Sequence, residues 1–122
     1  KSHRLRKSIA TERTFLKNIS SEIYLEKELE KVSESLSKRL ETAKVKGRTL
    51  TLKLKYSDFS SVTRSRTSSN YMNKRKDLFK LAKELLYQEK LKDSVRLIGL
   101  SMTNLDNKKE DSKTVVQLTL EF

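Results

Sequence analysis

The sequence predicts an α+β domain in which two amphipathic helices cover one face of a β-sheet and leave the other face open. Three observations support this. Apolar residues recur at helical spacing in two segments, β-prone or alternating residues fill four others, and the order is strand, helix, strand, strand, helix, strand. The 122 residues, 34% of them hydrophobic, are enough for one domain of this kind.

The first strand is predicted over residues 6–15, which contain several β-branched and aromatic side chains. A helix should follow, because Ser20 or Ser21 can cap it and Glu22 complements the positive end of the helix dipole. Gly47 is expected to end this helix. The apolar stripe of the helix advances by three or four residues at each step, through Leu25, Leu29, Val32, Leu36, Leu40 and Ala43.

The second strand is predicted over residues 48–56, where apolar and polar residues alternate strictly. Residues 57–59 form a turn, because Ser and Asp side chains bond to nearby backbone. Residues 63–69, "TRSRTSS", then return as the third strand. One face of the second strand carries Leu50, Leu52, Leu54 and Tyr56, and the other carries Thr49, Thr51, Lys53 and Lys55.

The second helix is predicted from about residue 73 to residue 90. Lys74, Arg75 and Lys76 lie in its first turn, where each exposed positive charge costs about 0.3–1 kcal/mol. An anion bound nearby would relieve this cost, and so would solvent and salt; the sequence leaves both open. The helix buries a stripe of Leu78, Leu81, Ala82, Leu85 and Leu86.

The fourth strand is predicted over residues 94–105, followed by a polar stretch over residues 106–113 and a second alternating segment over residues 114–122. In the fourth strand Ile98, Leu100 and Met102 share the face toward the helices, and Leu97, Gly99, Ser101 and Thr103 share the other. The open face of the sheet is therefore expected to carry Lys53, Lys55, Ser101, Thr103 and part of "TRSRTSS".

The net charge of +12 is concentrated in particular segments. Residues 44–80 hold eleven basic and two acidic side chains, whereas residues 18–43, which include the first helix, hold four basic and six acidic ones. A domain that is acidic at its back and basic on its open sheet favours a polyanionic partner, above all nucleic acid. The alternative is a lysine-rich surface that serves solubility alone.

The stretch "TRSRTSS" indicates contact with a phosphate backbone. Arginines neutralise phosphates, hydroxyls donate to their oxygens, and small side chains let the strand backbone approach. Strand alternation nevertheless places Arg64 and Arg66 on the face opposite Ser65 and Thr67, so only one pair can point straight at a ligand. The competing interpretation is a solvated edge strand whose charges deter aggregation.

Several classes of function find no support in the sequence. There is no Cys for a disulfide or a thiolate metal site, no apolar run near 20 residues, and no Gly-rich phosphate loop. The acids Glu22, Glu26, Glu30 and Glu34 have the spacing of an exposed helix face rather than of a metal-binding cluster. We expect no catalytic residue and no membrane segment in this chain, and a cytoplasmic location.

Five segments, in order, resemble the little finger, or polymerase-associated domain, of Y-family translesion DNA polymerases, nearest to the DNA polymerase IV group. They are "RKSIATERTF" (6–15), "KGRTLTLKLKYSDF" (46–59), "TRSRT" (63–67), "VRLIGLSMTNL" (95–105) and "QLTLEF" (117–122). Ala10 departs from the Gly that often follows "RKSI" in the family, but Ala is compatible with a strand.

The resemblance implies a four-stranded antiparallel sheet with two antiparallel helices on one face and an extended C-terminal tail. It also implies that the open face lies in the major groove of template–primer duplex and contacts phosphates of both strands. The catalytic Mg²⁺ ions would belong to the palm domain of a longer bacterial, nucleoid-associated polymerase, with no cofactor in this domain. The implied DNA-contacting residues are Arg6, Lys7, Ser8, Lys53, Lys55, Arg64, Ser65, Arg66, Thr67, Arg96, Ser101 and Thr103.

The tail has two interpretations. It is an additional edge strand, or it is a peptide that docks into a hydrophobic cleft of the processivity sliding clamp, as the resemblance implies. The second gives four parts: residues 1–8 link to the polymerase core, 9–105 bind DNA, 106–116 are a polar linker, and 117–122 bind the clamp. The anchors of that peptide would be Gln117, Leu118, Leu120 and Phe122.

Two other classes of domain have this order of strands and helices. An RNA-binding module would stack bases on aromatic residues of a strand, but "KGRTLTLKL" has none. A protein-interaction domain would use its charge for solubility only, and its binding to a polyanion would lack a steep dependence on salt.

Overall fold

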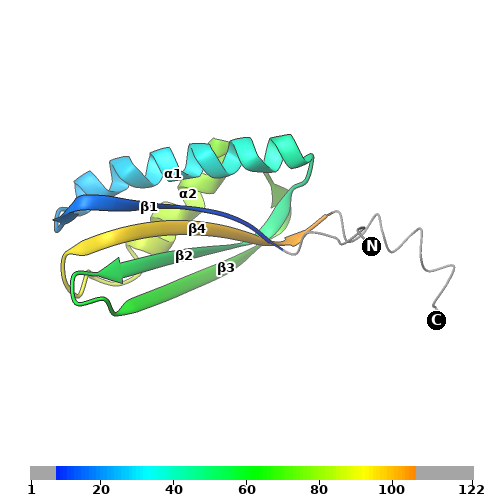
Figure 1. The fold of residues 1–122 in the computed structure, drawn as a ribbon. Coiled ribbons are helices and arrows are strands. Elements are labelled where there is room, and N and C mark those ends of the chain that lie inside the picture. Colours follow the sequence, from blue (N-terminus) through cyan, green and yellow to red (C-terminus); the bar gives the residue numbers. More distant parts are fainter. Residues whose placement is uncertain (1–7, 107–122) are drawn as a thin grey trace, which may run out of the picture.

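The computed structural model describes residues 8–106, which form one antiparallel sheet of four strands with both helices on one of its faces (Figure 1). The order of strands across the sheet is β1-β4-β2-β3, so β1 and β3 are its edges. The predicted fold class and order of elements are confirmed. The elements are β1 (Ser8–Ile19), α1 (Glu22–Ala43), β2 (Gly47–Tyr56), β3 (Ser61–Met72), α2 (Arg75–Leu86) and β4 (Val95–Leu105).

The core lies between the sheet and the two helices, as the periodicities predict. Each apolar stripe is turned toward the sheet, and the apolar face of the central strands is turned toward the helices. The interior is mostly leucine, with Leu25, Leu29, Leu36, Leu40, Leu50, Leu52, Leu54, Leu78, Leu85, Leu86, Ile98 and Leu100 buried almost completely.

The ends of α1 differ in part from the prediction. Ser21 is the N-cap, and its hydroxyl accepts a hydrogen bond from the backbone N–H of Tyr24 at 3.3 Å. The helix ends at Ala43, and Lys44 rather than a glycine takes the left-handed conformation (φ 60°). The prediction that Gly47 ends the helix is wrong. Gly47 begins β2, where a Cβ atom would lie 2.1 Å from Cγ of Met102, so the close packing of β2 on β4 requires a glycine.

Other boundaries shift by a few residues. β1 continues to Ile19, because an irregularity between Thr14 and Ile19 lets the strand rejoin β4 at Val95. β3 extends to Met72. α2 ends at Leu86 rather than near residue 90.

The basic first turn of α2 is partly neutralised within the domain. Lys74 is the N-cap and makes no side-chain capping bond, but the guanidinium of Arg75 pairs with the carboxylate of Glu30 on α1 at 2.9 Å. Asp77 adds a negative charge to the same turn. Contacts within the folded chain thus offset part of the unfavourable positive charge at this helix end, in addition to any bound anion or solvent.

Candidate nucleic-acid interface

The open face of the sheet is built of four rows of residues that run across all four strands. Ten of the sixteen positions carry a hydroxyl, because Ser and Thr occupy every open-face position of β3 and half of those on β1, β2 and β4. The two rows toward the β2–β3 turn hold the lysines. The rows are Ser8–Thr103–Thr49–Thr67, Ala10–Ser101–Thr51–Ser65, Glu12–Gly99–Lys53–Thr63 and Thr14–Leu97–Lys55–Ser61.

The hydroxyls of neighbouring strands are hydrogen-bonded in pairs. The side-chain oxygens of Thr49 and Thr67 lie 2.8 Å apart, and those of Thr51 and Ser65 lie 2.7 Å apart. The Asn104 side-chain N–H also donates to the Thr49 hydroxyl at 2.6 Å, so Thr49 can donate to Thr67 and leave the Thr67 hydrogen for another acceptor. Each pair therefore leaves one hydroxyl hydrogen available to whatever covers the sheet.

The stretch "TRSRTSS" is divided between the two faces of the sheet. Arg64 and Arg66 lie opposite Leu52 and Leu50, on the helix side, whereas Ser65 and Thr67 lie on the open face. Arg64 is 7% exposed, and its guanidinium donates to the backbone carbonyls of the last two residues of α2, at 2.9 and 3.0 Å. Arg66 pairs with Glu84 of α2 at 2.6 Å. Both arginines tie the edge strand β3 to the helix layer.

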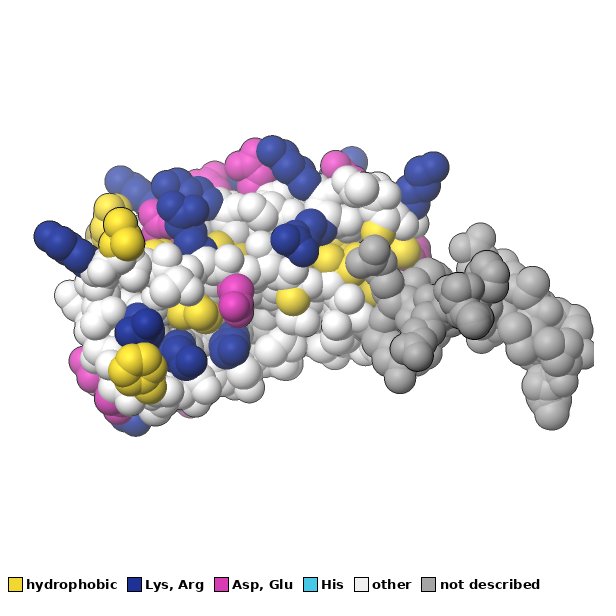
Figure 2. Space-filling model, viewed as in Figure 1, with side chains coloured by type: hydrophobic (Ala, Val, Ile, Leu, Met, Phe, Trp, Pro, Cys, Tyr) yellow, Lys and Arg dark blue, Asp and Glu magenta, His cyan; other side chains and the backbone are white. Residues whose placement is uncertain are grey.

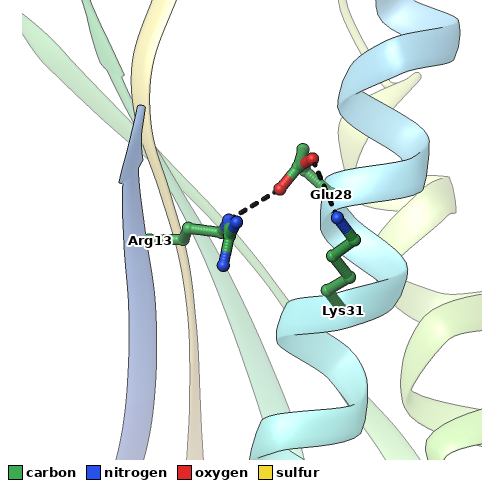
Figure 3. Close-up of polar contacts among 3 residues, drawn as sticks. All are labelled: Arg13, Glu28 and Lys31. Carbon is green, nitrogen blue, oxygen red and sulfur yellow. Dashed lines mark hydrogen bonds and ion pairs between the residues drawn. The ribbon is translucent and has the colours of Figure 1, made fainter. Parts of the chain in front are cut away.

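Carboxylates neutralise other cations of the helix side too. Figure 3 shows Glu28 of α1 between Arg13 of β1 and Lys31, with oxygen–nitrogen distances of 2.7 and 3.4 Å. Lys38 pairs with Glu34 at 3.7 Å. The excess positive charge on this side is thus reduced by partners within the fold.

The open-face cations differ in this respect. Within residues 8–106, neither Lys53 nor Lys55 has a carboxylate within salt-bridge distance, and Glu12 is the one acidic residue in the four rows. Figure 2 shows Lys and Arg side chains gathered at the end of the sheet where β2 turns into β3. The guanidinium carbon of Arg96 lies there, 4.4 Å from the centre of the Phe59 ring.

The structure therefore brings together seven of the predicted contact residues and separates others. Arg64 and Arg66 lie on the opposite face, and Arg96 lies at an irregularity of β4 beside the lysine rows. Sequence reasoning left Thr63 out, although alternation from Ser65 places it on the open face. Arg6, Lys7, Gln117, Leu118, Leu120 and Phe122 lie outside the described residues. The residues brought together are Ser8, Lys53, Lys55, Ser65, Thr67, Ser101 and Thr103.

The predicted linker begins with an anchored residue. The backbone N–H of Asp106 donates to the Lys46 carbonyl, and an Asp106 carboxylate oxygen accepts from the Lys46 N–H, both at 2.9 Å.

In the part of the chain that the structure describes, no three His, Cys, Asp or Glu side chains are grouped to hold a metal ion. Neither described helix is both long and apolar enough to cross a bilayer.

The profile of the impB/mucB/samB family C-terminal domain matches residues 6–120. The chain belongs to this family. Among its relatives, DNA polymerase IV of Listeria monocytogenes serotype 4a (strain HCC23) is 40% identical over 104 residues, which are 84% of this chain and 29% of the relative. DNA polymerase IV of Bacteroides fragilis (strain YCH46) is 39% identical over 121 residues, 98% of this chain and 33% of the relative. The chain thus spans about a third of the length of these relatives.

Solved structures agree with this assignment. A complex of β-clamp processivity factor and the little finger domain of PolIV contains a chain that is 25% identical, with a TM-score of 0.65 over 79% of this chain and 86% of that chain. The Y-family polymerase chimera Dbh-Dpo4(243-245)-Dbh shares the fold, with 18% identity and a TM-score of 0.69 over 84% of this chain and 29% of that chain. The predicted resemblance to a little finger domain of the DNA polymerase IV group is confirmed.

Proposed function

We propose that this little finger domain binds template–primer DNA through its backbone phosphates, with the open face of the sheet and without reading base sequence. The observation that carries the proposal is that the open face combines lysines without a carboxylate partner with rows of hydroxyls. Arg13, Arg66 and Arg75 are paired with carboxylates on the helix side, whereas Lys53 and Lys55 on the open face are not. Unpaired cations over a row of hydroxyl donors fit a phosphate backbone.

The shape of the open face supports the same partner. Its sixteen positions include no aromatic residue, so the rows offer no surface on which bases could stack as in RNA-binding sheets. Gly99 leaves a shallow depression between Glu12 and Lys53. Small side chains and this depression allow the backbone of a duplex to come close. Arg64 and Arg66 would support this surface from behind rather than contact DNA directly.

The parent protein would be a Y-family translesion polymerase in the bacterial cytoplasm and nucleoid. Its catalytic carboxylates and Mg²⁺ would lie in a palm domain outside this chain, which leaves this domain to hold the DNA product. Contacts with phosphates position a duplex but cannot select a lesion. Residues 1–8 would join this domain to the core domains of the same protein.

The C-terminal residues would recruit the polymerase to the sliding clamp. The similar little finger domain was solved together with a β-clamp, which supports a clamp as partner. Gln117, Leu118, Leu120 and Phe122 would be the anchors, and residues 106–116 would tether them. Such a tether raises the effective concentration of the domain at the clamp.

A salt titration of DNA binding tests the central part of this proposal. Affinity for a fluorescent duplex should fall log-linearly with salt and be the same for unrelated sequences. In the double variant Lys53→Ala/Lys55→Ala the slope of log K against log salt should be shallower by about 1.8, because each phosphate that is no longer neutralised reduces the slope by about 0.9.

The matched control is Lys27→Ala/Lys38→Ala, which removes the same charge from α1. It should leave the slope close to that of the wild type. Equal slopes for the two double variants would mean that net charge alone attracts the DNA, and would contradict the assignment of the open face.

A further inference from the structure

An exposed aromatic residue stands at the end of the open face, in the turn between β2 and β3. Phe59 is 64% exposed and has a φ of 71°, in the left-handed region that a bulky side chain rarely occupies. Glycine would avoid both the strain and the exposed ring, and Asn would reduce them. Strained residues persist only where the surrounding structure fixes them, and they are concentrated at functional sites.

The turn around Phe59 is fixed by a dense set of hydrogen bonds. The Phe59 N–H donates to the Tyr56 carbonyl at 2.9 Å, and the Tyr56 N–H donates to the Ser60 carbonyl at 2.8 Å. A carboxylate oxygen of Asp58 accepts from both the N–H and the hydroxyl of Ser60, at 2.9 and 2.6 Å. These bonds lower the pKa of Asp58, so its carboxylate stays charged and in place. The backbone from which the ring projects is therefore fixed.

The β4 strand supplies a cation to the same ring. Arg96 falls outside the regular pairing of β4 with both neighbours, because the ladders pass from Leu97 directly to Val95. Its guanidinium carbon lies 4.4 Å from the centre of the Phe59 ring, within the range of a cation–π contact. In Figure 2 Lys and Arg side chains lie beside hydrophobic atoms at this end of the sheet.

Two carboxylates lie close to this site, and both are used by the fold. Asp58 binds Ser60 within the turn, and Asp93 accepts from the Ser57 hydroxyl at 3.0 Å and from the Ser94 N–H at 2.7 Å. Neither forms a salt bridge with Arg96 among the described residues. The positive charge of Arg96 is therefore not neutralised by either carboxylate and is available to a ligand.

We propose that Phe59 and Arg96 form a stacking site for one unpaired nucleobase, at the end of the duplex that lies on the open face. This inference rests on the proposed DNA-binding function. The ring offers a flat apolar surface, Arg96 offers a second planar group and a positive charge, and Lys55 in the adjacent row can hold the phosphate of the same nucleotide. Stacking accepts any base, as a polymerase that copies all sequences requires.

The site differs in kind from the rest of the open face. Contacts between the rows and phosphates would not discriminate paired from unpaired DNA. Stacking on the Phe59 ring, in contrast, requires a base that is not already stacked between its neighbours in the duplex. The domain would then recognise the junction between duplex and single strand. An exposed aromatic that docks a protein partner is the alternative, and the experiment separates it.

The test compares blunt duplexes with duplexes that carry a short single-stranded overhang, at either the 5′ or the 3′ end. The first unpaired position holds 2-aminopurine, whose fluorescence falls when it stacks. We expect the wild-type chain to bind one overhang at least about fivefold more tightly than the blunt duplex and to quench its fluorescence, in line with base–aromatic stacking.

Three substitutions make the result specific. Phe59→Gly removes the ring and relieves the positive φ, so the overhang preference should disappear while the melting temperature does not fall. Phe59→Trp should retain the preference and the quenching. Tyr24→Ala, which removes an exposed aromatic from α1, is the matched control and should behave as the wild type.

The outcomes keep this inference distinct from the proposed function. If blunt duplex binds with the expected salt dependence but the overhang adds nothing, the stacking site is wrong and phosphate binding stands. Persistence of the preference in Phe59→Gly, or a large loss of stability in that variant, would likewise overturn the stacking role. If no DNA binds at low salt, both proposals fail, and the exposed ring becomes a candidate contact for a protein.

Discussion

The two faces of the sheet differ in how several of their cations are paired. On the helix side Arg13, Arg66 and Arg75 each meet a carboxylate, and Arg64 meets two carbonyls at the end of α2. On the open face the lysines have no such partners within the described residues, and each has a hydroxyl residue of β3 beside it. The comparison shows that a net charge of +12 says little about which cations bind DNA. Under the proposed function, the cations without a carboxylate partner are the ones expected to bind DNA.

Strand β3 shows this difference between the two faces within five residues. Arg64 and Arg66 point to the helices, and Thr63, Ser65 and Thr67 point to the open face. Arginine on the hidden side stabilises the edge strand, and small hydroxyl residues on the other side leave the surface flat. Substitutions in the two sets should therefore have different effects, the first on stability and the second on binding.

The largest effect on stability is expected for Arg64→Ala. The substitution removes the guanidinium donor from the carbonyls of Leu85 and Leu86 in a buried place, and Leu85 then keeps a backbone bond from Gln88 at 3.4 Å. The free energy of unfolding should fall by about 1.5–3 kcal/mol. Urea unfolding followed by circular dichroism would measure it. Arg66→Ala breaks only a half-exposed ion pair and should cost about 0–1 kcal/mol. Equal losses in the free energy of unfolding for the two variants would contradict the different roles given to Arg64 and Arg66.

The next effect concerns Glu28, which holds β1 to α1. Its side chain is 10% exposed and pairs with Arg13 and Lys31. Replacing it by Gln removes the charge but retains the shape, and should lower the free energy of unfolding by about 1–2 kcal/mol. DNA affinity at a fixed salt concentration should not fall, because the site lies on the helix side. A weakened affinity with unchanged stability would contradict the division into two faces.

A smaller effect, on binding alone, is expected for the hydroxyl pairs. Thr51→Val and Ser65→Ala together remove a donor from the open face with little change of shape. Affinity for duplex should fall about two- to tenfold, which corresponds to one or two net hydrogen bonds. The slope against salt should stay constant, since the substitutions leave every charge in place. A changed slope would show that the hydroxyls act through the placement of the lysines instead.

The smallest effect concerns Tyr87, which links α2 to α1. Its hydroxyl donates to a Glu26 carboxylate oxygen at 2.7 Å, and this hydrogen bond, with a little desolvation and the negative charges of Glu26 and Glu22, raises the pKa of Tyr87 to about 12. Because the folded pKa lies above the unfolded value of 10.0, the stabilisation is complete below pH 10 and is lost between pH 10 and about 12. The side chain is half-exposed, so the stability change should be small.

The difference in ultraviolet absorbance at 295 nm between the wild type and Tyr87→Phe isolates the titration of this tyrosine. It should show a midpoint well above 10. Glu26→Gln should bring the midpoint back toward 10. A wild-type midpoint near 10 would mean that the bond to Glu26 does not hold in solution.

Much of this arrangement could be predicted from the sequence. Strict alternation in residues 48–56 placed Lys53 and Lys55 on the open face, and the stripe from Leu25 to Leu40 placed α1 on the core. Periodicity succeeds there because burial of apolar groups outweighs every other local preference. The five segments that resemble the little finger domain then indicated the family.

The remainder depended on contacts between distant segments. Gly47 resembles a helix stop in sequence, but its role depends on Met102, which lies 55 residues further along the chain. Alternation showed that Arg64 and Arg66 share a face, but only the position of α2 shows which face it is. Phe59 could have been noticed as a large apolar residue inside a polar turn; its contact with Arg96 could not.

The most direct test of the account is a map of the DNA footprint by nuclear magnetic resonance. Backbone amide shifts would be followed while a 12-base-pair duplex is added to the labelled chain at low salt. The account predicts the largest shift changes in the open-face rows of β2, β3 and β4, centred on Lys53, Ser65 and Ser101, and small changes along the exposed side of α1. Changes concentrated on α1 or α2, with the open face unaffected, would contradict it.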